Sequence, residues 1–575
     1  MDQRNFATVL LLTATSCAAA DRRFALREPL TTDTDLRDVS LPCRADPTDT
    51  DPRHVRCVPA EYVSPLMWDG TDNLLFRPLA EAWTFRPSSE AVDVNAFDEV
   101  PDSSWFTNRL GVRAIPTGEL LRGACEPDQI LDPDREPDGS WVIDHGKNNG
   151  SSPGFRVDVR GRKYMFKVDA DAPERSSAAS VVGATAYHAV GFNTSCEQIV
   201  YVRPSLLKLT PGLMVQANFG EARPFDQAAL DKTLALASKS RDGRLRLLAS
   251  AWLPGRLLGP FRYEGTRADD PNDAIPHENR RELRGGRVLA AWLEHHDARE
   301  QNSMDAWIAA PKGAPDASPG HVVHYYLDTS DCLGSAWDWE PITRRIGTSY
   351  IVDWGDMARD FVTLGIPLRP WDRAKRVPGK EIFNFFDVQN FVPDAWKNEY
   401  ANPAFDRTTE RDAAWMARVL AHWTPEMVRD LASLARFTDP SNTEYLANVL
   451  EGRLEKILER YLTVLSPIAD LRVTAGDTLC ATDLAELRRL REPSRFAYAA
   501  RVGGRALRVD RPAPAAVCIR IPHVAPDGGA PDDASERYVR VEVADGVARG
   551  VLVAHLYDLG PTRGFRLVGL ERPEH

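Results

Sequence analysis

Residues 141–201 constrain the fold more tightly than any other stretch of this sequence, because sheet and helix patterns alternate there over a short length. The runs FRVDVRG and RKYMFKVD alternate on either side of Gly161, as the two strands of a β-hairpin do. The run SSAASVVGATAYHAVGF spaces small and apolar residues three and four apart, which predicts a helix, and EQIVYVRP then predicts another strand. We therefore expect strand, strand, helix and strand to form one compact unit.

The rest of the 575-residue chain is too long for one core and predicts about three or four domains. LRLLASAWL is a candidate strand, RRELRGGRVLAAWLEH predicts a helix, and HVVHYYLD predicts a strand. Helical patterns dominate residues 413–465, where Thr424 and Pro425 mark a helix start with Thr as the N-cap. After Pro467, short strand-like runs separated by Gly and Asp predict a small β-sandwich-like domain.

The N-terminal residues resemble a targeting segment, with Arg4 before an apolar run and small residues after it. Two processing sites compete: a lipobox-like run that ends at Cys17, and an ordinary signal-peptidase site at residues 18–20. A lipid on Cys17 would anchor the protein to a membrane without spanning it. We expect an exported protein, either a cell-envelope lipoprotein on the periplasmic or outer-surface side or a secreted protein. Residues 21–60, rich in Asp, Pro, Thr and Arg, predict a loosely ordered tether.

Cysteine spacing and net charge limit the other possibilities. The seven cysteines after Cys17 lack the paired spacing of a zinc site. Cys43 with Cys57, and Cys480 with Cys518, are candidate disulfides in an oxidising compartment, and buried free thiols are the equal alternative for each pair. The formal charge of −12 gives no global attraction to nucleic acid, so we expect no such partner.

The run HHDAREQN carries the first candidate catalytic residues, Asp297, Arg299 and Asn302. An Asn five residues after an Asp has the spacing of the kinase catalytic loop, in which the Asp orients or deprotonates the attacking group and the Asn oxygen holds a metal. Arg299 is placed to neutralise a transferring phosphoryl group. The alternative is a solvated turn, since an Asp and an Asn at this spacing are common.

The run HVVHYYLDTSDCLGS supplies the candidate metal ligands. It is an apolar strand that ends at Asp328, where a kinase keeps the metal-binding Asp of its DFG motif. Thr and Ser follow here, so the aromatic residue of DFG is missing, and Asp331 is a second candidate ligand. A β-turn with Asp at its first position is the alternative.

Phosphate-binding candidates precede both carboxylate motifs. Lys167 lies on the opposite strand face from Tyr164 and Phe166, where it can point into a cleft and hold nucleotide phosphates. Glycines in the run HGKNNGSSPGF let backbone N–H groups approach an anion closely. The alternatives are an exposed strand lysine and a plain surface loop. The candidates in this run are Gly146, Lys147, Gly150, Ser151 and Gly154.

Taken in order, these runs resemble exported bacterial proteins of an atypical kinase group related to the spore-coat CotH kinases and the HipA-like kinases. The resemblance covers about residues 95–465. It implies a two-lobed α+β kinase-like fold, ATP with Mg²⁺ or Mn²⁺, and phosphorylation of a protein or cell-envelope acceptor. It assigns the nucleotide lysine to Lys167, the catalytic Asp to Asp297, and the metal ligands to Asn302 and Asp328.

Together these readings predict five parts: a signal peptide, possibly of the lipoprotein type, an N-terminal arm and extension that packs on the kinase-like domain, a small lobe, a large lobe and a C-terminal β-rich domain. Their predicted ranges are 1–20, 21–135, 136–205, 206–467 and 468–575.

One departure bears on catalysis. Related sequences carry an acidic residue on the helix after the lysine strand, where this chain has Ser180, and Glu174 or Glu197 are the candidate replacements. Two alternatives to an active kinase therefore stay open: a pseudokinase that serves as an extracytoplasmic scaffold, and transfer of AMP or glutamate by the same fold.

Overall fold

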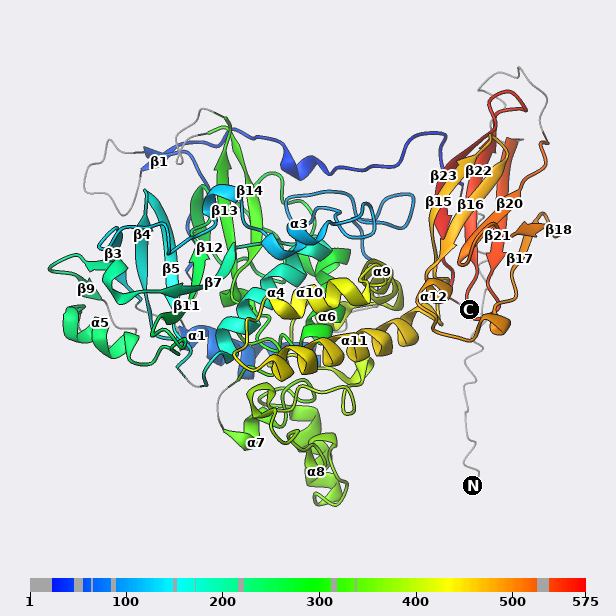
Figure 1. The fold of residues 1–575 in the computed structure, drawn as a ribbon. Helices are drawn as coiled ribbons and strands as arrows, with labels where there is room; N and C mark the ends of the chain where they lie inside the picture. The colour runs from blue at the N-terminus through cyan, green and yellow to red at the C-terminus, as the bar shows by residue number, and fades with distance from the viewer. Residues whose placement is uncertain are drawn as a thin grey trace, which may run out of the picture.

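The computed structural model describes residues 23–45, 55–63, 66–83, 89–147, 152–170, 172–215, 222–311, 318–336, 339–524 and 537–574. The predicted targeting segment with Cys17, and Gly150 and Ser151 of the glycine-rich run, lie outside these residues. The chain is mixed α/β, with several sheets and helices (Figure 1). Among the described residues, no helix combines the length and apolar character needed to cross a membrane.

Six strands form the first sheet, in the order β7-β11-β5-β4-β3-β8. The predicted hairpin around Gly161 is confirmed as β4 and β5, and LRLLASAWL forms β11, which pairs with both β5 and β7. The sheet therefore extends beyond residue 205, where the sequence places the boundary between lobes. The strands are β3 Trp141–Gly146, β4 Gly154–Val159, β5 Arg162–Lys167, β7 Glu197–Val202, β8 Leu207–Leu209 and β11 Leu245–Ala251.

Each face of this sheet is covered. On one face the predicted helix, α4 (Arg175–Val190), places Val181 against Ile199 and Leu248. On the other, Trp141 and Phe166 share a core with Leu230 of α5. Helix α5 spans Gln227–Leu234, and the short strands β9 (Met214–Val215) and β10 (Arg223–Pro224) precede it.

A second sheet has the order β12-β13-β14-β6, and a helical region follows it. The N-cap predicted at Thr424 is confirmed, because its side chain accepts from the Met427 N–H. Trp292, Trp415 and Trp423 are fully buried in the shared helical core. The elements are β6 Asn193–Thr194, β12 Arg256–Gly259, α6 Arg281–Leu293, β13 Ser303–Ala309, β14 Gly320–Tyr326, α9 Glu410–Leu420, α10 Pro425–Ser433 and α11 Pro440–Leu462.

Between β14 and α9 the chain is mostly irregular and contains two short helices, α7 (Glu340–Thr343) and α8 (Trp354–Thr363). In Figure 1 this segment projects below α11, on the side away from β13 and β14. Its later residues return to the helical core, where Phe383, Phe386 and Trp396 are buried.

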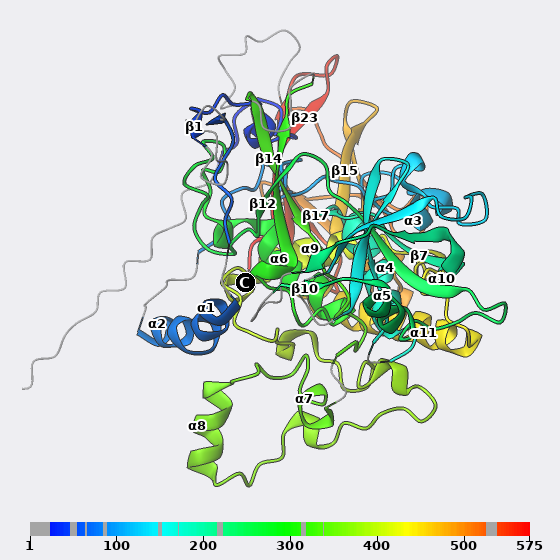
Figure 2. The same cartoon turned by 90° about the vertical axis from the view of Figure 1, so that its left-hand side faces the viewer.

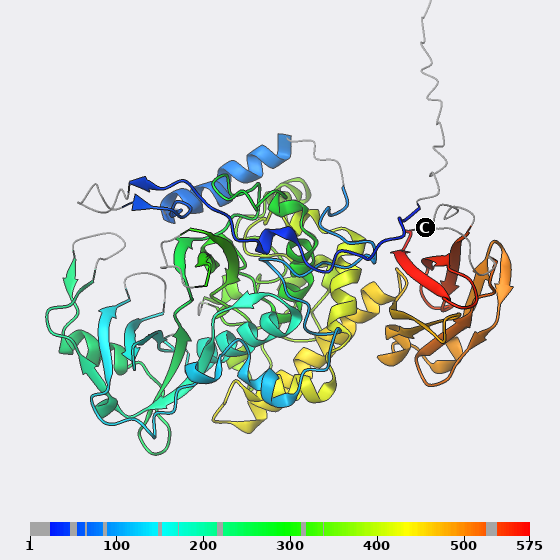
Figure 3. The same cartoon turned by 90° about the horizontal axis from the view of Figure 1, so that it is seen from above.

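The described part of the N-terminal arm, residues 23–45, contacts both the C-terminal domain and the body of the chain. Phe24 packs with Tyr557 and Val568 of the C-terminal domain. Buried Asp35 accepts hydrogen bonds from the Ser104 N–H and hydroxyl. Figure 3 shows the arm running from the C-terminal domain across the body to β1.

The C-terminal domain has two packed sheets, which confirms the β-sandwich-like prediction (Figure 1). The first has the order β15-β16-β20-β19 and the second β18-β17-β21-β22-β23, and Val517 and Val541 lie in their shared core. A short helix, α12, spans Leu484–Leu487. The strands are β15 Ile468–Thr474, β16 Thr478–Asp483, β17 Ala499–Val502, β18 Arg505–Leu507, β19 Val509–Asp510, β20 Ala516–Arg520, β21 Tyr538–Ala544, β22 Leu552–Asp558 and β23 Phe565–Glu571.

Both candidate disulfides form, and a third that the sequence does not predict joins Cys125 to Cys196. Cys43–Cys57 joins β1 (Arg44–Ala45) to β2 (Val55–Arg56), and Cys480–Cys518 joins facing residues of β16 and β20. Cys125, just after α3 (Thr117–Arg122), is tied to the turn before β7.

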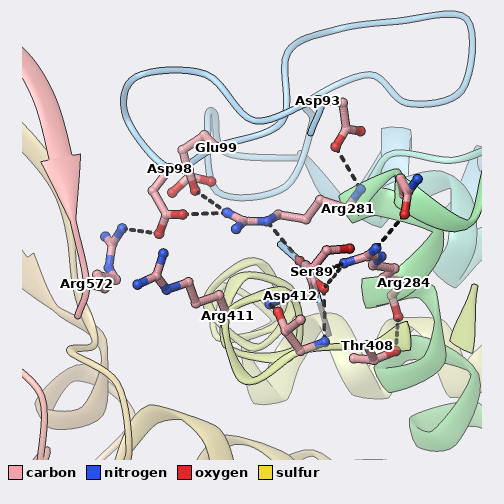
Figure 4. A network of polar contacts seen from close by, with 12 residues as sticks. Ser89, Asp93, Asp98, Glu99, Arg281, Arg284, Thr408, Arg411, Asp412 and Arg572 are labelled. Carbon is pink, nitrogen blue, oxygen red and sulfur yellow. Dashed lines mark hydrogen bonds and ion pairs between the residues drawn. The ribbon is translucent and has the colours of Figure 1, made fainter. Parts of the chain in front are cut away.

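A buried carboxylate joins the C-terminal domain to the helical region (Figure 4). Asp98 lies 2.6 Å from Arg281 of α6, 3.4 Å from Arg418 of α9 and 3.0 Å from Arg572, which directly follows β23. Burial alone would raise the pKa of Asp98, but the three guanidinium charges hold it far below its usual range. Asp98 is therefore ionised and balances three cations that are almost inaccessible to water.

Candidate active site

The β13–β14 hairpin brings two of the predicted motifs together. Ser303 pairs with Tyr326, so the residue before β13 and the residue after β14 lie side by side. The Leu327 N–H accordingly donates to the Asn302 carbonyl at 3.0 Å. Asn302 and Asp328 therefore meet at one end of the hairpin, because antiparallel pairing fixes their register.

The loop after α6 holds the catalytic candidate in place. The Asn302 amide donates to the Asp297 carbonyl oxygen at 2.7 Å and to its carboxylate at 2.9 Å. Arg299 Nε lies 2.7 Å from Asp297 Oδ1. The side chains of Asp297 and Arg299 are 13% and 25% exposed, so the group is recessed but reachable.

Asp328 pairs with the strand lysine across the two sheets. Lys167 Nζ donates to Asp328 Oδ2 at 3.0 Å. Burial alone would lower the pKa of Lys167, but the charges of Asp328 and Glu197 raise it. Burial would likewise raise the pKa of Asp328, but the Lys167 charge and a hydrogen bond from Ser330 hold it well below its usual value. Both members of the pair are therefore charged at neutral pH.

Asp331 adds a third carboxyl group to the same space. Its pKa is raised well above the usual range, first by burial and then by the charges of Asp297 and Asp328. Burial and these charges therefore favour the protonated form of Asp331 beside ionised Asp328. Such crowding of carboxylates is relieved by a cation.

The donor chemistry fits a magnesium or manganese ion only in part. Asp328 offers carboxylate oxygen, and Asn302 offers its amide oxygen, because its nitrogen is engaged by Asp297. Oxygen donors of this kind suit Mg²⁺, which commonly takes one or two protein ligands together with phosphate oxygens. Among the described residues, no group of three or more His, Cys, Asp or Glu is arranged to hold a metal by itself. The phosphates of a nucleotide would have to complete such a site.

Lys147 lies close enough to Lys167 to feel its charge. Its pKa is lowered to about 8, first by burial and then by the Lys167 cation. The Lys147 ammonium group donates to the Ser152 carbonyl at 2.7 Å. Two recessed ammonium groups near one another favour an anionic ligand.

The two described glycines of the predicted phosphate loop have packing roles. A Cβ on Gly154 would lie 2.2 Å from the Phe166 carbonyl oxygen, and one on Gly146 would lie 2.4 Å from Val215. Close approach to neighbouring strands therefore explains both glycines without a phosphate.

The predicted replacement of the missing acidic partner by Glu174 is wrong, whereas Glu197 is correctly positioned. The Glu174 carboxylate accepts hydrogen bonds from the Thr438 N–H and hydroxyl, which commits it elsewhere. Glu197 shares a sheet face with Lys167, since Leu248 of β11 pairs with both Lys167 and Ile199. Ser180, at the position of the missing acidic residue, accepts a hydrogen bond from the Thr329 hydroxyl with its backbone carbonyl.

The pKa of Glu197 lies close to neutral pH. Burial raises its pKa to about 7, although the Lys167 charge opposes the rise. Ser195 and Ser250 each donate to its carboxylate at 2.6 Å. At neutral pH, Glu197 is therefore ionised in only part of the molecules.

The sequence gives no signal for Glu399, which contacts the catalytic candidate from an irregular segment. Its N–H donates to the His296 carbonyl at 2.7 Å, and the residue is 6% exposed. Burial and the adjacent Asp297 raise the pKa of Glu399 to about 9, which favours its protonated form at neutral pH. Asn398 and Asn402 both donate to the Ala298 carbonyl and fix the same loop.

His295, two residues before Asp297, is buried and contacts a tyrosine. His295 Nδ1 is 2.9 Å from the Tyr187 hydroxyl, and burial lowers the pKa of His295 to about 4. A cavity of about 870 Å³ lies elsewhere, behind α4, bordered by Glu197, Tyr201 and Arg246. Its lining includes neither Lys167 nor Asp328.

Neither family models nor curated proteins match the chain. Among solved structures, it is similar to the crystal structure of a Helicobacter pylori proinflammatory kinase, CtkA, at 10% identity and a TM-score of 0.29. That alignment covers 55% of this chain and 94% of the other. A likeness this weak decides nothing about the site. The comparisons give no match to the CotH or HipA-like kinases that the sequence resembles. The site is therefore interpreted from its own geometry.

Proposed function

We propose that the chain is an ATP- and divalent-metal-dependent phosphotransferase of the atypical kinase type, acting on a protein or cell-envelope component. One observation carries this proposal. The β13–β14 hairpin joins the Asp297–Asn302 loop to Asp328, and Asp328 receives Lys167 from the first sheet at 3.0 Å. Residue types that phosphoryl transfer needs are thereby close together in space, although their motifs are far apart in the sequence.

One set of side chains would bind the nucleotide and the metal. Lys167 and Lys147 would bind nucleotide phosphates, and Asn302 and Asp328 would hold the metal, with Asp331 beside them. When bound, the metal would offset the negative charge of the phosphates. Because Lys167 is paired with Asp328 in this structure, nucleotide binding must redirect the ammonium group toward phosphate.

Asp297 and Arg299 would act at the acceptor. Asp297 orients the acceptor hydroxyl and takes its proton as the oxygen attacks the terminal phosphorus, and the bond to the ADP oxygen breaks. Arg299, 2.7 Å from Asp297, balances charge on the phosphoryl group. Glu399 lies next to the same Asp297 and would act as a positioning residue for it.

A pseudokinase scaffold is the second candidate, favoured by the acidic partner of Lys167. That partner is Glu197 on β7, which titrates near pH 7, in place of a residue on α4. In this case the C-terminal β domain would supply the contact surface. Three disulfides support an exported location for either form, with a lipid anchor at Cys17 as part of the proposal.

Radiolabelled ATP separates these possibilities. We expect label from the γ position to reach an acceptor or the chain itself with Mg²⁺ or Mn²⁺, and Asp297→Asn to abolish this. Asp510→Asn, on β19, is the matched control. Transfer of the α label would identify AMP transfer instead. Nucleotide binding without transfer of either label would leave the pseudokinase.

A further inference from the structure

Exposed apolar side chains are concentrated on one part of this molecule. More than half of the large apolar side chains that are exposed in the described residues lie within residues 67–83 and 339–368. The first range belongs to α1 (Leu66–Thr71), the π-helical turn η2 (Asp72–Phe76) and α2 (Arg77–Trp83). The second includes Trp339 and Trp354, which are both exposed.

Helix α8 turns its apolar side to solvent. Trp354, Met357, Phe361 and Leu364 follow one helical face and are 48%, 53%, 85% and 85% exposed. The opposite side is anchored, because Asp356 and Asp360 pair with Arg369. An amphipathic helix of a soluble domain ordinarily buries its apolar face. An exposed apolar face of this extent therefore indicates an interaction surface.

The two apolar segments touch each other. Trp354 Nε1 donates to the Leu74 carbonyl at 3.3 Å, and Trp68 and Phe76 lie with ring centres 5.6 Å apart on the same helical segment. Figure 2 shows α1 and α2 on the same side of the molecule as α8. Arg77 pairs with Glu300 at 3.3 Å, which ties the segment to the loop that carries Asp297.

Positive charge lies on one of the two segments of this face. Residues 66–83 contain one Arg and three Asp or Glu, whereas residues 339–380 contain eight Lys or Arg and five Asp or Glu. Three of those acids, Asp353, Asp356 and Asp360, are paired with Lys or Arg. Arg373 and Lys375 are exposed and, within the described ranges, form no ion pair.

The shape of the face also limits which kind of partner it can bind. Helix α8 lies on the part of the chain that projects farthest below the body (Figure 1). A projecting ridge of Trp, Phe, Leu and Met flanked by Lys and Arg fits the boundary between lipid headgroups and acyl chains. We propose that α1–α2, α8 and residues 366–376 form a membrane-docking face for a bilayer that contains anionic phospholipid. The proposal does not depend on catalysis.

Vesicle co-sedimentation tests this face in the full chain. Every protein carries Cys17→Ser, so that no acyl chain contributes to binding. We expect the parent to bind phosphatidylcholine vesicles that contain phosphatidylglycerol, and to bind pure phosphatidylcholine vesicles much more weakly. Phe361→Ser with Leu364→Ser should weaken binding about tenfold or more. Arg373→Gln with Lys375→Gln should weaken it about fivefold per residue.

Val112→Ser with Val524→Ser is the matched control, since both side chains are exposed outside the face. Binding that is unchanged by both face variants, or that ignores phosphatidylglycerol, would overturn the proposal. So would concentration-dependent self-association in sedimentation velocity that the Phe361 and Leu364 changes abolish, because the face would then join two copies of the chain.

Discussion

Removing the Asp98 carboxylate should destabilise the junction between the helical region and the C-terminal domain. Asp98→Asn would leave Arg281, Arg418 and Arg572 buried with one fewer anion, and their side chains are only 2%, 4% and 1% exposed. Loss of one partner from a buried ionic group costs about 3–5 kcal/mol. At about 2 °C per kcal/mol, the melting transition should fall by roughly 6–10 °C.

Differential scanning calorimetry measures this change and separates the transitions of a multidomain chain. Glu99→Gln is the matched control, because Glu99 also pairs with Arg418 but is 39% exposed, and surface pairs contribute about 0–1 kcal/mol. The pKa of Asp98 is depressed on folding, so its stabilising effect is present above its unfolded pKa and is lost as pH falls below about 4. Equal melting of Asp98→Asn and Glu99→Gln at pH 7 would refute this account.

Three further changes have defined outcomes. Lys147→Ala should weaken nucleotide affinity measured by calorimetric titration, because one of two adjacent cations is lost, and unchanged affinity would remove Lys147 from the site. Glu399→Gln should flatten the dependence of melting temperature on pH: folding raises the pKa of Glu399 from 4.5 to about 9, so wild-type stability falls as pH rises through that interval. Identical pH profiles would show that Glu399 is not the titrating group. Replacing Cys125 and Cys196 by Ala should cost about 4 kcal/mol by loop-closure entropy, and an unchanged denaturant midpoint would contradict this.

The sequence predicts those features that depend on neighbouring residues. Strand alternation around Gly161 and the Thr424 N-cap are local patterns, and both are confirmed. The order of Lys167, Asp297 and Asp328 also predicts a shared site, and the structure pairs Lys167 with Asp328 and bonds Leu327, the residue before Asp328, to Asn302. Hairpin pairing and strand ends are sufficient to place these groups.

Features that depend on tertiary packing are not predicted. Glu399 reaches Asp297 from an irregular segment with no motif, and Glu174 is drawn to Thr438 by the loop after α10. The exposed side of α8 has the same periodicity as a buried helix face, so spacing alone cannot distinguish them. Burial of Asp98 among three arginines likewise arises only when distant segments meet.

Nucleotide binding at Asp328 is the most direct test of the proposed function. The measurement is the thermal shift of the chain with ATP and Mg²⁺ or Mn²⁺, beside Asp328→Ala and the Asp510→Asn control. At a nucleotide concentration one hundred times Kd, binding should add about 2.7 kcal/mol and raise the melting temperature. The account predicts a metal-dependent rise in the parent and control that Asp328→Ala loses. A well-folded parent that shows no rise, or a rise that Asp328→Ala retains in full, would contradict it.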